Sequence, residues 1–244
     1  MSASLFLVAE LPTGPSFTLD GPEGHHAADV QRVRPGAPVT LSDGRGGSIA
    51  ATVTSVAKGS VVLHLSPPTF VPAPTPSLTV IQGIPKGDRG ELAVQAMTEV
   101  GVDEIIPWSA SRCVTQWRGD RGAKAQAKWA ATAREAAKQS RRPWLPVVSG
   151  APDLGTSQVA ARLSAAAAAF VLHEDATSPL TAAELPSEGE IALVVGPEGG
   201  ITDAEIDAFV AAGAVPVRLG EAVLRTSTAG VAAISVLSAR MGRW

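Results

Sequence analysis

The sequence lacks several residues on which common functional sites depend. It has no tyrosine, its only cysteine is Cys113, and aromatic residues make up 4% of its 244 positions. A lone cysteine excludes an internal disulfide framework and a cysteine-based zinc site. Among the four histidines, His25 and His26 are adjacent, while His64 and His173 are isolated. We therefore expect a metal-free protein.

Long apolar runs are also missing. The longest, Ser164 to Leu172, is too short to span a membrane, and it reads as a helix end that runs into a strand. The N-terminus lacks the basic and apolar regions of a signal peptide. Hydrophobic residues make up 45% and charged residues 18% of the chain, which is typical of a well-buried globular protein. We expect a cytoplasmic protein.

Charge is distributed unevenly along the chain. The formal net charge is −3, yet residues 112–142 contain nine basic and two acidic residues. The nine are Arg112, Arg118, Arg121, Lys124, Lys128, Arg134, Lys138, Arg141 and Arg142. Such a segment is either a solvated helix surface or a surface that binds phosphates, and the sequence alone leaves both open.

A proline-rich segment divides the chain. Residues 66–77 contain five prolines, so we expect an extended linker there and neither a helix nor a central strand. Before it, five short apolar segments within 5–66 alternate with turn residues, which predicts a small β-barrel; only residues 23–33 look helical. We place the N-terminal domain at 1–70, the linker at 71–78 and the C-terminal domain at 79–244.

The C-terminal part alternates between predicted strands and helices. Apolar segments near 77–84, 104–110, 170–175, 191–196 and 216–220 are predicted strands. Helical patterns follow all of these except 170–175, which is preceded by a helical pattern over 156–169; the basic segment is predicted to form the helix over about 120–140. Strands that alternate with helices indicate an α/β domain with a parallel sheet.

A glycine-rich loop follows the apolar run Ile191–Val195. The loop Gly196–Gly200 reads Gly-Pro-Glu-Gly-Gly, and Thr202 and Glu205 form a capping box at the start of the next helix. A loop at the carboxyl end of a buried parallel strand is where α/β sheets bind ligands. Neither a dinucleotide fingerprint nor a P-loop is present. The alternative is a purely structural turn.

A second loop repeats this arrangement. Residues 217–230 contain a strand end with glycine, then Arg225 and the hydroxyls of Thr226, Ser227 and Thr228, one of which is expected to N-cap the last helix. Two such loops can form one pocket. Because they hold no nucleophile–base pair, the pocket suits a cofactor that carries its own reactive group.

Two further segments place basic residues at helix ends. Lys86, Asp88 and Arg89 precede a predicted helix, either as a charged helix entrance or as contacts to a polyanion. His25, followed by Arg32 and Arg34, lies on the short N-terminal helical segment. These residues could touch RNA, or a histidine could pack within the barrel.

Five motifs together resemble one protein family. They are GHHAADVQRVRPG, PKGDRGELAVQAMTEVGV, EAAKQSRR, GPEGGITDAE and LGEAVLRTSTA, in this order along nearly the whole chain. They are similar to the ribosomal RNA small subunit methyltransferase E family of the SPOUT class. The resemblance implies a PUA-like barrel, an α/β domain with a deep trefoil knot, a homodimer, and S-adenosylmethionine as methyl donor. It also implies methylation of N3 of one uridine of 16S rRNA in the 30S subunit.

The resemblance assigns roles to individual residues. Its cofactor pocket comprises Leu172, His173, Glu174, Val195, Gly196, Pro197, Glu198, Gly199, Gly200, Leu219, Gly220, Val223, Leu224, Arg225, Thr226 and Thr228. Arg225 is the expected catalytic cation, because among the basic residues of the two loops only Arg218 accompanies it, and Glu198 is a candidate general base. RNA contacts are expected from His25, Arg32, Arg34, Lys86, Arg89, Arg112, Arg141 and Arg142.

This chain departs from the family pattern at three positions. Ser227 stands where glutamate is usual, Lys138 where an acid is common, and Gln31 where leucine is usual. The first argues against a carboxylate role at position 227. Two other functions stay open: a non-catalytic RNA-binding or ribosome assembly protein, and a nucleotide-dependent α/β enzyme, against which the missing phosphate fingerprints count.

Overall fold

The computed structural model describes residues 3–152 and 154–244. The chain divides into two compact units, one made of Met1–Ala73 with Ala137–Leu145 and the other of Pro74–Ala136 with Pro146–Trp244. Each unit encloses a hydrophobic core of its own.

The N-terminal unit is built on a five-stranded sheet with the strand order β1-β3-β4-β5-β2. β1 pairs with β3 in parallel and the other pairs are antiparallel. The strands are β1 (Ser4–Leu7), β2 (Ser16–Leu19), β3 (Pro38–Ser42), β4 (Gly47–Ala57) and β5 (Ser60–Phe70). In β4, Ile49, Ala51 and Val53 are buried while the residues between them are more exposed, the alternation of a sheet with one covered face. All five predicted strands are present.

The helical segment of this unit is irregular. α1 (Gly21–His25) continues directly into the π-helix η1 (His26–Val30). The expected linker starts later than the proline count indicates, because β5 runs through Pro67 and Pro68. β2 pairs with β5 only as far as His64, so the later part of β5 is an edge strand, where proline is tolerated.

A distant segment completes this unit. Residues 137–145, which the sequence places with the C-terminal domain, contact the turn before β4: Gly46 N–H donates to Pro143 O and Leu145 N–H to Gly44 O, both at 2.9 Å. The Trp144 ring N–H donates to Val71 O at 2.9 Å. The Trp144–Val71 contact joins residues 73 positions apart, and contacts between such distant residues leave no local pattern in the sequence.

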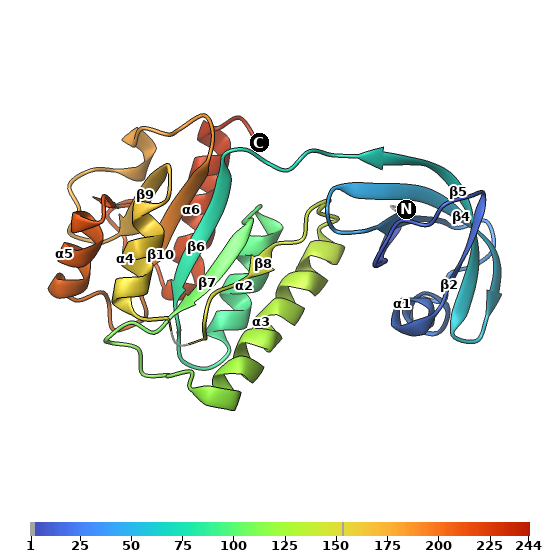
Figure 1. Ribbon diagram of the computed structural model, residues 1–244, viewed down its shortest axis with the longest axis horizontal. Coiled ribbons are helices and arrows are strands. Elements are labelled where there is room, and N and C mark those ends of the chain that lie inside the picture. Colours follow the sequence, from blue (N-terminus) through green and yellow to red (C-terminus); the bar gives the residue numbers. More distant parts are fainter. Residues whose placement is uncertain (1–2, 153) are drawn as a thin grey trace. The chain divides into compact units, whose positions relative to one another are not determined.

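The second unit contains a six-stranded sheet in which every pairing is parallel, as predicted. The strand order is β11-β9-β10-β6-β7-β8 (Figure 1). The strands are β6 (Ser77–Gly83), β7 (Glu104–Trp108), β8 (Val147–Val148), β9 (Ala168–Leu172), β10 (Glu190–Val195) and β11 (Val215–Val217). The two-residue β8 was not predicted, because it is too short to leave a pattern.

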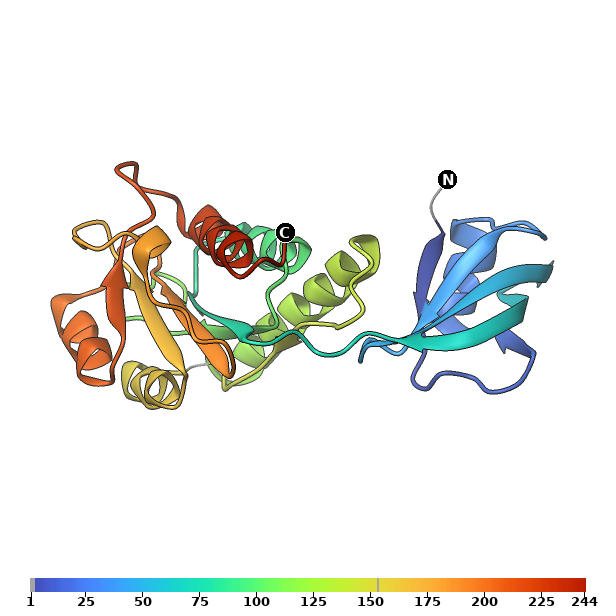
Figure 2. The same cartoon turned by 90° about the horizontal axis from the view of Figure 1, so that it is seen from above.

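Helices cover both faces of this sheet (Figure 2). They are α2 (Arg89–Glu99), α3 (Gly119–Gln139), α4 (Thr156–Ser164), α5 (Asp203–Ala211), α6 (Thr226–Arg240) and the short 3₁₀ turn η2 (Leu180–Ala182). α2 and α6 pack together, with α6 against β6 and β10, while α4 and α5 contact each other beside β9 and β11. Within the described ranges, no helix has the length and apolar character needed to cross a membrane.

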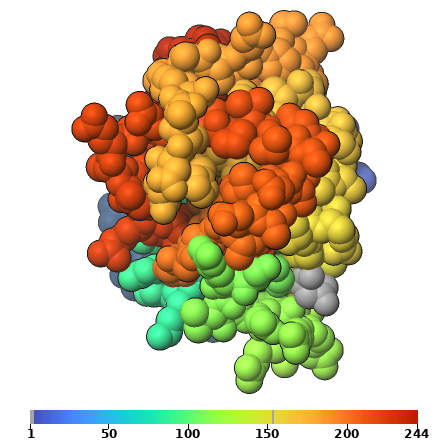
Figure 3. All heavy atoms as spheres, turned by 90° about the vertical axis from the view of Figure 1, so that its left-hand side faces the viewer, coloured from blue at the N-terminus to red at the C-terminus, as the bar shows by residue number. Residues whose placement is uncertain are grey.

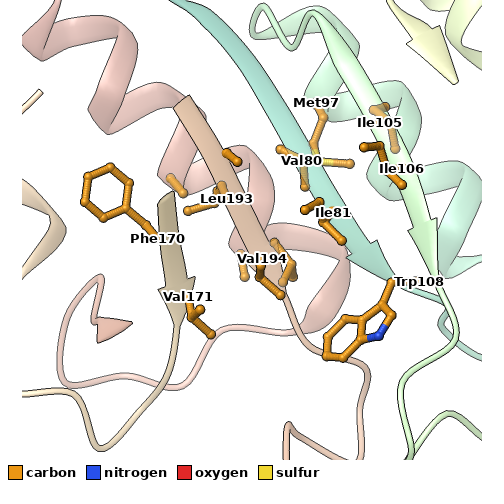
Figure 4. Packing of buried hydrophobic residues seen from close by; sticks show 14 of the residues in the cluster. Val80, Ile81, Met97, Ile105, Ile106, Trp108, Phe170, Val171, Leu193 and Val194 are labelled. Atoms are coloured by element: carbon orange, nitrogen blue, oxygen red, sulfur yellow. The ribbon is translucent and has the colours of Figure 1, made fainter. Parts of the chain in front are cut away.

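The core of this unit explains why its strands lack alternation. Val80 and Ile81 of β6 and Leu193 and Val194 of β10 are consecutive residues, yet all four are buried (Figure 4). A parallel sheet covered on both faces requires this pattern. Since the strands are parallel, their carboxyl ends and the loops that follow them meet at one edge.

Candidate active site

A cavity of about 580 Å³ opens at the carboxyl edge of the parallel sheet. Three loops form its walls, those after β9, β10 and β11, and Figure 3 shows the face on which they lie, coloured amber to red. Its lining comprises Arg89, Arg112, Leu172, His173, Glu174, Asp175, Val195–Ile201, Asp203, Val217–Thr226 and Ala229. The two glycine loops predicted to share a pocket therefore do so.

The loop after β10 is anchored by a buried carboxylate. Glu205 is 3% exposed, and its oxygens accept hydrogen bonds at 2.8 Å from the backbone N–H groups of Ser111 and Thr202 and from the Thr202 hydroxyl. Burial opposes ionisation of Glu205, but these hydrogen bonds outweigh it and lower the pKa below its usual value. The predicted Thr202–Glu205 capping box is confirmed.

Glu198 connects this loop to the loop after β6. Its Oε1 accepts the Lys86 backbone N–H at 3.2 Å and lies 3.4 Å from the Arg89 guanidinium. Arg112 holds the next residue, because its guanidinium donates to Gly199 O at 3.2 Å. Two arginines predicted to contact RNA, Arg89 and Arg112, thus lie at the cavity.

The loop after β11 offers its backbone to the cavity. The backbone N–H groups of residues 219–225 make no hydrogen bond within the part of the chain that the structure describes. The apolar side chains of Val223 and Leu224 are 74% and 40% exposed. Free N–H donors beside apolar groups form a wall suited to a ligand with both polar and apolar parts.

The start of α6 differs from the prediction. The N-cap is Arg225, without a side-chain cap, so the expectation that a hydroxyl caps this helix is wrong. Thr226 Oγ1 donates instead to Gly196 O at 2.8 Å and accepts from Gln82 Nε2 at 2.9 Å. These two bonds satisfy the Thr226 hydroxyl, and Arg225, Thr226 and Ala229 of this helix start line the cavity.

Most of the residues expected to form the pocket line the cavity. Every residue expected to hold the cofactor lines the cavity except Thr228, which is exposed and whose hydroxyl donates to Arg225 O at 3.2 Å. Arg225 and Glu198, the expected catalytic pair, both line it. The cavity also includes Asp175 and Asp203, which the sequence analysis did not name, because a single acidic residue after a strand or at the start of a helix carries no distinctive spacing.

The other expected RNA contacts lie outside the cavity. His25, Arg32, Arg34, Arg141 and Arg142 belong to the N-terminal unit. His25 Nδ1 lies 2.7 Å from an Asp29 carboxylate oxygen. Arg32 and Arg141 have positive φ angles of 53° and 56°, an uncommon conformation for residues other than glycine.

Neither a reactive thiol nor a cluster of metal-ligating side chains occurs at this site among the described residues. Burial raises the pKa of the Cys113 thiol to about 11, which keeps it protonated and unreactive at neutral pH. In residues 3–152 and 154–244, no group of three or more His, Cys, Asp or Glu residues could hold a metal ion. The charged side chains that line the cavity are arginines and carboxylates.

Sequence and structure comparisons relate the chain to known proteins. Residues 72–238 match the RNA methyltransferase domain family, and residues 19–66 match the RNA methyltransferase PUA domain family. The chain is 42% identical over its full length to the ribosomal RNA small subunit methyltransferase E of Mycobacterium bovis, covering 94% of that protein. It is 30% identical to the Bacillus subtilis protein of the same name, with 94% and 92% of the two chains covered.

A solved structure shares the whole fold. The ribosomal RNA small subunit methyltransferase E of Neisseria gonorrhoeae, crystallised with S-adenosyl methionine, is 29% identical and superposes with a TM-score of 0.86. The match covers 98% of each chain. Both units therefore have counterparts in that protein.

Proposed function

The chain belongs to the ribosomal RNA small subunit methyltransferase E family, and we propose that it transfers a methyl group from S-adenosylmethionine to N3 of one uridine of 16S rRNA. The observation that carries this proposal is the convergence of two glycine loops on one cavity in a chain related to these enzymes over its full length. The substrate in this proposal is RNA of the small ribosomal subunit.

The residues of the cavity fit S-adenosylmethionine. A volume of about 580 Å³ is in the range of small-molecule sites, and the free N–H groups of residues 219–225 lie beside Leu219, Val223 and Leu224. These donors can hold polar atoms of the cofactor while the apolar side chains cover its adenine. When bound, S-adenosylmethionine supplies an electrophilic methyl group. The chain must therefore bind the cofactor, orient its methyl group towards the uridine and exclude water.

We propose Arg225 as the catalytic cation. Uridine N3 carries a proton, and once the proton leaves, negative charge spreads over the neighbouring carbonyl oxygens. Arg225 is at the N-terminus of α6, where the free N–H groups of the first turn add positive potential. A guanidinium at this position stabilises the uridine anion.

We propose Glu198 as the group that accepts the proton. Its Oε1 is held by the Lys86 N–H and Arg89, which fixes the carboxylate at the cavity wall. Its second oxygen, Oε2, makes no hydrogen bond within the described residues. That oxygen is the one available to the substrate.

The RNA contacts divide between the two domains in this proposal. The barrel domain, residues 1–70, binds RNA with His25, Arg32 and Arg34, and the linker 71–78 leads into the methyltransferase domain 79–244. Lys86, Arg89 and Arg112 approach the nucleotide at the cavity, and Arg141 and Arg142 bind phosphates.

Three further properties follow from the family resemblance. We propose that the loops after β9, β10 and β11 form a deep trefoil knot, that the protein works in the cytoplasm, and that it is a homodimer. The exposed apolar side chain of Leu92 offers surface for a second copy to cover. Sedimentation at several concentrations measures the oligomeric state.

Mass spectrometry of 16S rRNA tests the function. We expect cells that lack this protein to lose one uridine methyl group, and cells complemented with the wild-type chain to regain it. An Arg225→Ala chain at equal abundance is the matched control and should not restore it. Full methylation without the protein would contradict the proposal. Binding of S-adenosylhomocysteine without methyl transfer to 30S subunits would favour a ribosome assembly role.

A further inference from the structure

A chain of two buried hydrogen bonds joins the two glycine loops of the cavity. Gln82, near the carboxyl end of β6, is fully buried, and its Nε2 donates to Thr226 Oγ1 at 2.9 Å. Thr226 Oγ1 in turn donates to Gly196 O at 2.8 Å. One side chain of β6 thereby holds the first residue after β10 and the first residue of α6.

Two members of this hydrogen-bonded chain, Gly196 and Thr226, line the cavity. Gly196 begins the loop after β10, and Thr226 directly follows Arg225. The same hydroxyl therefore sets the position of one cavity wall relative to the proposed catalytic cation. The end of β6 packs closely against the loop after β10, because a Cβ at Gly83 would come within 2.6 Å of Pro197 N.

The Gln82 amide is poorly suited to a purely structural role. Nε2 also donates to Gly83 O at 3.1 Å, but Oε1 is buried and has no partner within the described residues. A buried acceptor without a donor opposes folding. An apolar side chain of similar size would satisfy the core at this position without that cost.

We propose that Gln82 is a positioning residue for methyl transfer: acting through Thr226, it aligns the Gly196 loop with Arg225. The reaction named in this inference rests on the proposed function. The alignment of the two loops depends only on the two hydrogen bonds. Loss of the Thr226 hydroxyl breaks both bonds, and loss of the Gln82 amide removes the donor that holds this hydroxyl in place. Either change therefore lets the two cavity walls move relative to each other. Misplacement of reacting groups by about 1 Å can cost about 100-fold in rate.

Four variants of the full-length protein test the inference. We expect Gln82→Leu and Thr226→Val each to lower kcat about 100-fold and to raise the Kd for S-adenosylhomocysteine about fivefold. Thr226→Ser keeps the hydroxyl and should stay close to wild type. The double variant should be no worse than either single variant, because each single change already breaks the chain.

Thr79→Val is the matched control for the loss of a buried hydroxyl. Thr79 is on the same strand, is 2% exposed, and its Oγ1 donates to Glu104 Oε2 at 3.3 Å, towards the amino-terminal end of β6. We expect its kcat and Kd to stay within about twofold of wild type, since this bond does not reach the cavity. Thermal unfolding of Gln82→Leu should shift by no more than about 4 °C, because removal of the unpaired acceptor offsets the lost hydrogen bonds.

Two results would overturn the inference. One is a folded Gln82→Leu protein with wild-type kcat and Kd; the other is additive losses in the double variant. A wild-type chain that binds S-adenosylhomocysteine but methylates no RNA would instead overturn the proposed function. The Kd comparison among the four variants would then still decide whether Gln82 and Thr226 act as one unit.

Discussion

At the residue scale, we expect removal of Arg225 to affect methyl transfer and to leave cofactor binding unchanged. It is exposed at the N-cap of α6 and lines the cavity. We expect Arg225→Ala to lower the methyl-transfer rate about 100-fold or more, because a cation matters most once the uridine is an anion. The Kd for S-adenosylhomocysteine, measured by calorimetry, should change little. Single-turnover kinetics with 30S subunits measures the rate.

Arg218 provides the comparison for this prediction. It also lines the cavity, at the end of β11, and it is exposed. If general positive charge were enough, Arg218→Ala and Arg225→Ala would lower the rate equally. We expect Arg218→Ala to lose no more than about tenfold, and near-wild-type turnover by Arg225→Ala would refute the role of Arg225.

Glu198 can act by accepting a proton or by holding the loop after β6, and two substitutions separate these roles. Glu198→Gln keeps an acceptor for the Lys86 N–H but cannot take a proton, whereas Glu198→Ala loses both abilities. If Glu198 is the proton acceptor, both variants should be slow, and the rate of Glu198→Gln should recover as the pH rises and hydroxide replaces it. If Glu198→Gln transfers methyl groups at a normal rate and Glu198→Ala is slow, Glu198 holds the loop and does not accept the proton.

Glu205 makes the stability of the protein depend on pH. Its folded pKa is below the ordinary value of 4.5, since the bonds from Ser111 and Thr202 outweigh burial. The carboxylate therefore stabilises the fold fully above that ordinary value, and this contribution is lost as the pH falls through the lowered pKa. We expect Glu205→Gln to unfold more easily at pH 7 and to lack this pH dependence. Asp207→Asn, an exposed change on the same helix, should keep it.

At the scale of the elements, the two glycine loops should respond differently to the same substitution. A Cβ at Gly199 would lie 2.9 Å from the Cβ and O of Arg112, whereas nothing lies within 4 Å of a Cβ at Gly220. We expect Gly199→Ala to cost about 1–3 kcal/mol of stability through overpacking. Gly220→Ala should leave the melting temperature unchanged and weaken S-adenosylhomocysteine binding about tenfold, because its methyl group enters the cavity. Unchanged binding by Gly220→Ala would mean that the ligand does not approach this loop.

The elements differ in how far sequence alone predicts them. The parallel sheet and the shared pocket were predictable, because apolar runs such as Ile191–Val195 mark buried strands and parallel strands end at one edge. The Thr202–Glu205 box was predictable because its two residues are three positions apart. All of these signals are local or follow from strand direction.

The missed features depend on contacts between distant residues. Gln82 is one of three polar residues of β6, with Ser77 and Thr79, and the role proposed for it depends on β6 lying beside β10 and α6. One of the hydroxyls of Thr226, Ser227 and Thr228 was expected to cap the last helix, whereas the Thr226 hydroxyl bonds across 30 residues to Gly196. The contact of residues 137–145 with the barrel likewise depends on tertiary packing.

At the scale of the whole molecule, RNA affinity should come from a few concentrated arginines, since the net charge is −3. Arg32, Arg34, Arg141 and Arg142 belong to one compact unit. Each phosphate contact that is lost lowers the slope of log K against log salt by about 0.7–0.9. We therefore expect the double variants Arg32→Glu/Arg34→Glu and Arg141→Glu/Arg142→Glu each to weaken 30S binding and to flatten this slope.

The salt dependence distinguishes phosphate contacts from general charge effects. Lys58→Glu reverses one exposed charge in the β4–β5 turn of the same unit and is the control; it should leave the slope unchanged. If the two arginine pairs contact different phosphates, their effects on the slope should add in the fourfold variant. An unchanged slope for Arg141→Glu/Arg142→Glu would identify the end of α3 as a solvated surface, and the RNA contacts would then depend on the barrel and on the arginines at the cavity.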